Sequence, residues 1–170
     1  MDALNDDAPI GPDTRTVLVK EASTMALYVS VSLLAALTAL AEADEQTHPA
    51  VLGVVWGTTM GLAVAHLFAF RVSAKLVAQG SFPVEDRIAA AGQLAGAAAV
   101  AALCTGPVLW LPSTAELDVA RIALALFVAA VGYVVAHAHG SSRSRAILYG
   151  VTLFVVAVVV ALLKNVLSGH

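Results

Sequence analysis

The sequence predicts an all-α protein in which about five helices cross a membrane as a bundle. Three observations predict this fold class. Hydrophobic residues make up 59% of the 170 residues, and charged residues only 12%. The mean hydropathy is +0.86, and a chain this short cannot bury so much apolar surface away from water. The apolar residues also gather in stretches of about 20 or more, the length that crosses a hydrocarbon core as a helix.

Backbone amides inside lipid need internal hydrogen-bond partners, which only helices and closed barrels supply. The chain lacks the alternating segments of about ten residues that build a barrel, so the apolar stretches are interpreted as helices. These belong to a single transmembrane domain at 17–170, which follows an acidic segment at 1–16 that we expect to be a flexible tail. The predicted helices are about 22–41, 50–76, 86–110, 115–139 and 144–167.

The first apolar stretch could also belong to a cleaved signal peptide. Arg15 and Lys20 precede it, and an Ala-Leu-Ala sequence stands just before Glu42. However, the stretch is longer than a usual signal core and carries several hydroxyl side chains. We therefore favour a helix that stays attached to the mature protein.

Helix-ending and helix-starting residues separate the later stretches. Gly80 is a stop signal after the second stretch, and Gly140 is one after the fourth. Ser113 and Glu116 have the spacing of a capping box at the start of the fourth stretch. Pro107 should kink or terminate the third helix near its end.

The basic residues predict the orientation in the membrane. If five helices cross, only Arg121 and Lys164 fall on one side. Lysine and arginine are enriched on the cytoplasmic side, so the N-terminus should be cytoplasmic and the C-terminus outside, in a multi-pass protein of the cell membrane. The seven basic residues on the cytoplasmic side would be Arg15, Lys20, Arg71, Lys75, Arg87, Arg143 and Arg145.

Glycines at a spacing of four predict close helix packing. The second stretch holds Gly53, Gly57 and Gly61 along one helix face, and the third holds Gly92 and Gly96. Where such a face has no side chains, a neighbouring backbone can approach closely. We favour packing within one protomer, and self-association of two copies remains the alternative.

Polar residues recur at helical spacing on the first two stretches. Thr59 and His66 are seven residues apart and so share roughly one face. Because the two helices are sequential and antiparallel, Thr24 or Tyr28 should reach the depth of His66. The candidates for a polar pathway or for interhelical hydrogen bonds are Glu21, Thr24, Tyr28, Thr59, His66 and Gln93.

His66 has two interpretations. Ionisable side chains inside a membrane are costly and often functional, which would give His66 a role in proton or ion handling. A neutral ring bonded to a hydroxyl costs less than a charged one, and we favour that structural bond. Glu21 beside Lys20 is expected to mark the membrane surface, with a buried carboxylate as the alternative, and Gln93 is expected to bridge two helices.

Several classes of function are disfavoured. The net charge is −3 and the basic residues lie between apolar stretches, so no basic surface is available for nucleic acid. Cys104 is the single cysteine, which excludes an intrachain disulfide, and His137 and His139 do not share a helix face that would chelate a metal. No nucleotide-binding, zinc-protease or serine-hydrolase motif occurs, and we expect neither a metal nor a cofactor.

The segments VKEASTMALYVSVSLLAAL, VWGTTMGLAVAHLFAFRVSAKL and KNVLSGH resemble those of small multi-helix integral membrane proteins of actinobacterial type, whose activity is not characterised. The resemblance covers most of the chain and carries no catalytic motif. It implies five membrane helices and no particular activity, and no functional residue is carried over from it.

The function that these observations favour is a non-catalytic, membrane-embedded module. Its partners would be the lipid bilayer and, in a possible oligomer, a second copy or another membrane protein. The alternative is transport, by an oligomeric ion channel or a proton-coupled carrier that uses the polar residues of the first two helices. A membrane enzyme is less favoured, because no nucleophile, base and orienting group converge in the sequence.

Overall fold

The computed structural model describes residues 12–40, 47–77, 84–138 and 140–167, and these are almost entirely helical. The helices are α1 (Pro12–Leu40), α2 (His48–Val77), α3 (Val84–Trp110), α4 (Ser113–Ala138) and α5 (Arg143–Leu167). All five are long and apolar enough to cross a membrane. The predicted all-α, five-helix transmembrane class is therefore confirmed.

The largest difference from the predicted boundaries is at the start of α1. This helix begins at Pro12, well before residue 22 and inside the segment that we expected to be a tail. Proline fits the first turn of a helix because its missing N–H would have no partner there in any case. Hydropathy finds only the part of a helix that lipid surrounds, so it misses polar first turns. The rest of the predicted tail, 1–11, lies outside the described residues.

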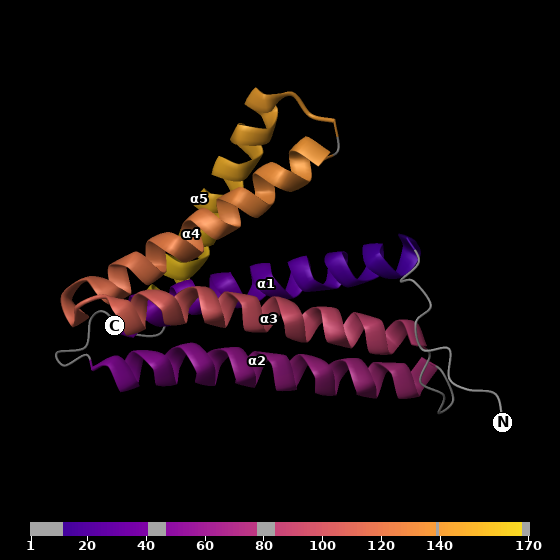
Figure 1. Cartoon of the computed structure of the whole chain (residues 1–170), viewed down its shortest axis with the longest axis horizontal. Coiled ribbons are helices and arrows are strands. Elements are labelled where there is room, and N and C mark those ends of the chain that lie inside the picture. The colour runs from indigo at the N-terminus through magenta and orange to yellow at the C-terminus, as the bar shows by residue number, and fades with distance from the viewer. Residues whose placement is uncertain (1–11, 41–46, 78–83, 139, 168–170) are drawn as a thin grey trace.

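The five helices form two groups (Figure 1). Helices α1, α2 and α3 lie side by side and alternate in direction, and α1 packs most extensively against α3. Helices α4 and α5 form a hairpin that meets the other helices near the start of α4 and leans away from them toward its turn. The successive reversals put the starts of α1, α3 and α5 at one end of the fold, together with the C-terminal end of α2.

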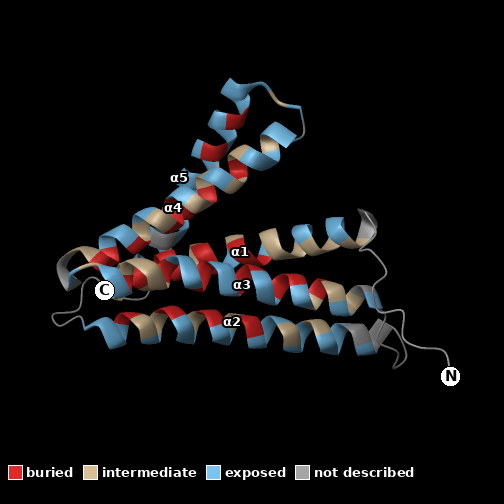
Figure 2. Ribbon diagram, viewed as in Figure 1, coloured by how far each residue is buried: buried red, intermediate tan, exposed pale blue. Residues whose placement is uncertain are grey.

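The core is apolar and lies where α1 and α3 meet the hairpin (Figure 2). Val29 and Leu33 of α1 and Val100 and Cys104 of α3 are almost completely buried in it. The outer faces of α2, α4 and α5 instead expose large apolar side chains, such as Phe68, which is 70% exposed. Exposed apolar surface on this scale suits a lipid environment.

The glycines of the two stretches lie in different surroundings. A Cβ atom on Gly96 would collide with the backbone oxygen of Ala22, and one on Gly92 would lie 2.7 Å from the Leu18 oxygen. The close approach of α3 to α1 therefore requires glycine at both positions. Around Gly57 the space is open, because a Cβ atom added there would have nothing within 4 Å.

The same openness holds for the other two glycines of α2, Gly53 and Gly61. The buried residues of α2 recur every fourth position, from Val51 through Val55. A glycine two positions further along a helix points to the opposite side. These glycines thus face outward, and they make no close contact within the described protomer.

Three local features differ from or add to the sequence analysis. Pro107 does not terminate α3, which continues to Trp110. The turn after α4 has Gly140 at a φ of 77°, with Ser141 N–H bonded to the Ala136 carbonyl, a C-terminal cap that favours glycine. Gly150 of α5 faces the α4 backbone closely, a packing position that the sequence analysis did not identify.

Orientation in the membrane stays a prediction. In a Cys104→Ala background, Thr47→Cys should react with an impermeant thiol reagent added to intact cells, whereas Ser142→Cys should react only after permeabilisation. Both side chains are exposed, and the chain path places them at opposite ends of the fold. The reverse pattern of labelling would put the N-terminus outside.

Candidate functional site

Five of the six predicted polar residues meet at one place. A cavity of about 160 Å³ lies between α1, α2 and α3 toward the end where α1 begins. Five of its six described lining residues carry a polar group, although most of the surface that they present to the cavity is apolar. The lining residues are Glu21, Thr24, Met25, Tyr28, His66 and Gln93.

A hydrogen bond between α3 and α1 forms the back of the cavity. Gln93 Nε2 donates to Glu21 Oε2 at 2.8 Å. Gln93 is only 4% exposed, and its Oε1 atom has no hydrogen-bond partner in the described ranges. The tight packing of Gly92 and Gly96 on α1 positions both side chains, because it brings the two backbones together at this depth.

The hydroxyl groups are arranged differently from what we expected. Thr24 donates its hydroxyl to the Lys20 carbonyl at 2.9 Å. Thr59 is buried outside the cavity lining and donates to the Val55 carbonyl at 2.7 Å. Serine and threonine often bond back to their own helix in this way. Among the described residues, no hydrogen bond joins His66 to Thr24, Tyr28 or Thr59.

Comparison with known protein families, curated proteins and solved structures finds no match to this chain. The resemblance to actinobacterial-type membrane proteins stays a prediction.

The cavity is rich in hydrogen-bond acceptors. Gln93 Oε1 is an acceptor without a partner, the Glu21 carboxylate accepts one bond from Gln93, and the Thr24 hydroxyl already uses its proton. The cavity volume is about 160 Å³, whereas one water molecule occupies about 30 Å³ in the liquid. A few waters or a small ligand group that donates hydrogen bonds would fit and would satisfy the free acceptor.

The polar lining does not continue across the membrane-spanning part of the fold. Beyond Met25 the core of α1 continues with Val29, Leu33 and Leu37, which are almost completely buried. The buried hydroxyl of Ser30 is bonded to its own helix, at 2.7 Å from the Ala26 carbonyl oxygen. The polar side chains of the cavity are therefore confined to the part of the fold nearer the start of α1.

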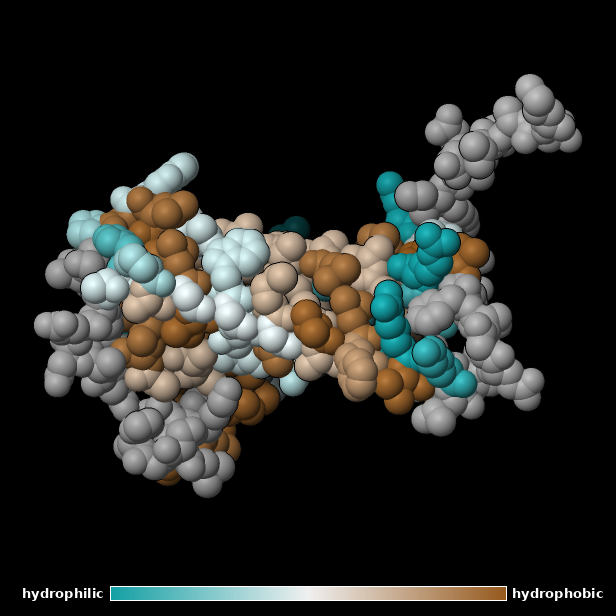
Figure 3. Space-filling view, turned by 90° about the horizontal axis from the view of Figure 1, so that it is seen from below, coloured by the Kyte–Doolittle hydropathy of each residue, from teal (hydrophilic) through white to brown (hydrophobic). Residues whose placement is uncertain are grey.

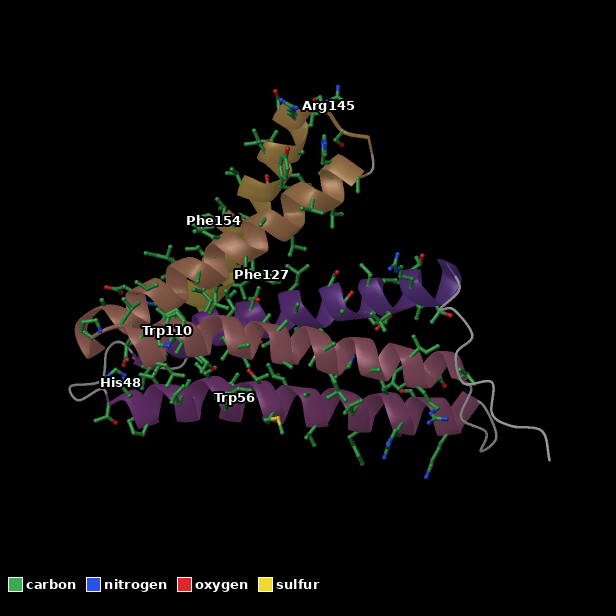
Figure 4. The ribbon with its side chains drawn as sticks, in the orientation of Figure 1. His48, Trp56, Trp110, Phe127, Arg145 and Phe154 are labelled. Carbon is green, nitrogen blue, oxygen red and sulfur yellow. The ribbon has the colours of Figure 1, made fainter. Side chains whose placement is uncertain are left out.

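A second polar cluster lies at the other end and was missed in the sequence. Glu116 of α4 is completely buried, and its Oε2 lies 2.5 Å from Nδ1 of His48 at the start of α2. The same Nδ1 atom is 2.9 Å from the Val108 carbonyl oxygen, to which it is suitably aligned for donation. Figure 4 shows His48 at the start of α2. Glu116 therefore has a close charge partner but no well-aligned hydrogen bond to either oxygen among the described residues.

This arrangement corrects the capping-box prediction for Glu116. A capping box would bond its carboxylate to the backbone N–H of Ser113, but neither carboxylate oxygen has a hydrogen bond to a described residue. The order of the helices could have predicted that His48 and Glu116 lie close together, because five antiparallel helices bring the starts of α2 and α4 to the same end of the fold. No group of three metal-ligating side chains occurs in the described ranges.

Proposed function

We propose that this multi-pass protein is a non-catalytic module of the cell membrane whose polar cavity binds a small cationic hydrogen-bond donor, such as an ammonium group. The observation that carries the proposal is Gln93 Oε1. Among the described residues this buried acceptor has no partner, and Gln93 and Glu21 both line the cavity. A protonated amine would donate to both oxygens at once.

The energetics favour a ligand of this kind. A buried acceptor without a partner costs about 1–3 kcal/mol, which a bound donor would recover. A positive charge next to Glu21 is also favourable in partly apolar surroundings, where electrostatic interactions are stronger than in water. The cavity is lined by exposed Tyr28 and His66 side chains, so a small ligand can enter from outside the protein.

We expect alkylammonium salts to stabilise the protein against thermal unfolding. Cys104 is the only cysteine and is buried in the core, so a thiol-reactive fluorogenic dye reports its exposure on melting. Ethylammonium chloride should raise the melting temperature of the wild type more than sodium chloride at equal ionic strength. Glu21→Gln and Gln93→Leu should lose that difference.

Asp118→Asn is the matched control for this measurement. Asp118 is an exposed carboxylate that pairs with Arg121, at the end of the fold opposite to the cavity. Its replacement should leave the ethylammonium effect unchanged. Equal stabilisation of the wild type and Glu21→Gln by ethylammonium would refute amine binding at this site.

A proton-coupled carrier is the second candidate, because two ionisable side chains, Glu21 and His66, line the same cavity. In that case, proton uptake by liposomes containing the protein should depend on pH and should be lost in His66→Gln. The module proposal expects no flux above protein-free liposomes. An ion channel would have to run between protomers, because the core of one protomer is apolar beyond the cavity.

We further propose that the outward glycine face of α2 is a self-association surface. Gly57→Leu should leave the melting temperature of the monomer in detergent nearly unchanged, because the space around the position is open. In lipid bilayers the same change should lower the dimer fraction measured by energy transfer between labelled copies. An unchanged dimer fraction, or no dimer in the wild type, would place this face against lipid or against another protein.

A further inference from the structure

A second hollow lies on the outer side of α2 and α3, at the end where α2 finishes and α3 begins. It is a groove with a volume of about 950 Å³, within the range of pockets that bind small molecules. Seven of its lining residues are apolar, and they include Leu67, Phe68 and Leu94. The groove shares no lining residue with the polar cavity.

The other three lining residues are basic. Arg71 and Lys75 are one helical turn apart on α2, and Arg87 lies near the start of α3. Because the two helices are antiparallel neighbours, their positive charges converge at one end of the groove. Within the part of the chain that the structure describes, the lining residues include no acidic side chain. In Figure 3, hydrophilic side chains gather beside hydrophobic ones over the C-terminal part of α2.

Charge and hydrophobicity are ordered along the helix axis. Phe68 lies one turn before Arg71 and about 10 Å before Lys75, at 1.5 Å of rise per residue. The charged end is therefore the membrane-surface end of the groove, and the apolar part extends toward the middle of the bilayer. A phospholipid has the same order, with a phosphate at the surface and acyl chains below.

We propose that this groove binds an anionic phospholipid. Its headgroup phosphate would contact Arg71, Lys75 and Arg87, and an acyl chain would lie along Phe68, Leu67 and Leu94. Basic side chains at a helix end can extend to the membrane surface on any helix. The convergence of three of them from two helices over an apolar hollow is what distinguishes this groove.

The positive charge selects an anionic headgroup over a zwitterionic one. Phosphatidylglycerol carries a net negative charge, whereas the phosphate charge of phosphatidylcholine is balanced by its own ammonium group. Each basic residue near an anionic membrane surface contributes a free energy that corresponds to about a fivefold change in affinity. Each neutralised groove cation should therefore reduce the preference for phosphatidylglycerol by about that factor.

Fluorescence quenching by brominated lipids can measure this preference in the full chain. Trp56 and Trp110 are replaced by phenylalanine, and Phe68→Trp places the only tryptophan in the groove. The protein is reconstituted in phosphatidylcholine vesicles that contain increasing fractions of brominated phosphatidylglycerol or brominated phosphatidylcholine. We expect phosphatidylglycerol to bind about tenfold or more tightly than phosphatidylcholine at this position.

Lys75→Gln and Arg87→Gln should each reduce that ratio, and together they should nearly abolish it. Arg143→Gln with Arg145→Gln is the matched control, because these arginines belong to the same end of the fold but do not line the groove. Equal affinities for the two lipids in the parent protein would overturn the proposal. An equal loss of the lipid preference in the control would also overturn it, because the preference would then come from general surface charge. An absence of quenching would overturn it as well, because protein would then cover the groove.

Discussion

Gly96→Ala is expected to separate α1 from α3 and to disrupt the polar cavity. The added methyl group would collide with the backbone oxygen of Ala22, which cannot rotate away as a side chain could. Overpacking of a close contact typically costs about 1–3 kcal/mol, and the substitution also displaces the partners of the Glu21–Gln93 bond. This loss should outweigh the gain of about 1 kcal/mol that alanine brings to a helix interior.

The effect can be measured by thermal unfolding in detergent, with Cys104 labelling as the signal. Gly53→Ala on α2 is the control, because a Cβ atom added at Gly53 would have nothing within 4 Å. It should keep or slightly raise the melting temperature, while Gly96→Ala lowers it by several degrees. If both variants melt like the wild type, the close contact between α1 and α3 is not part of the folded protein.

His48→Ala is expected to produce the second large effect, at the opposite end of the molecule. It removes the basic side chain that lies next to Glu116 in the described structure and leaves the completely buried carboxyl group without that partner. Because His48 is about half exposed, we expect a loss of about 1–3 kcal/mol rather than the larger cost of breaking a fully buried pair. Thermal unfolding in the same detergent measures this loss.

A double-mutant cycle tests the cause of that loss. Glu116→Leu removes the buried charge, so adding His48→Ala to it should cost much less than His48→Ala alone. The control pair is Asp118 and Arg121 on the same helix, whose exposed contact should contribute less than about 1 kcal/mol. Additive effects of the His48 and Glu116 changes would show that the two side chains do not interact.

Much of the fold could be predicted because lipid imposes a simple rule on sequence. Each span needs about 20 apolar residues, and that length is visible without any knowledge of tertiary contacts. The cavity was partly predictable for a similar reason, since the spacing of Thr24 and Tyr28 on one helix and the position of His66 on the next fix their relative depth. Gln93 stood out as a polar side chain within an apolar helix.

The remaining features depend on which helix faces meet. The glycines of α2 and those of α3 have the same spacing, yet only Gly92 and Gly96 contact another backbone closely. Nothing in the spacing says which face is turned inward. The tertiary contact of Glu116 was not predicted, because its position in the first turn of α4 also suits a helix cap. Its contact with His48 depends on how the intervening helices pack, which sequence patterns do not specify.

The lean of the α4–α5 hairpin gives the molecule an asymmetric shape in the bilayer. The hairpin diverges from α1–α3 toward its turn (Figure 1), so with α1–α3 across the bilayer we expect a broader cross-section in the leaflet next to Arg143 than in the other leaflet. Bilayers deform around the proteins that they contain at a modest energetic cost. A body that is wider in one leaflet lowers this cost where that leaflet is expanded, so we expect the protein to favour membrane of the matching curvature.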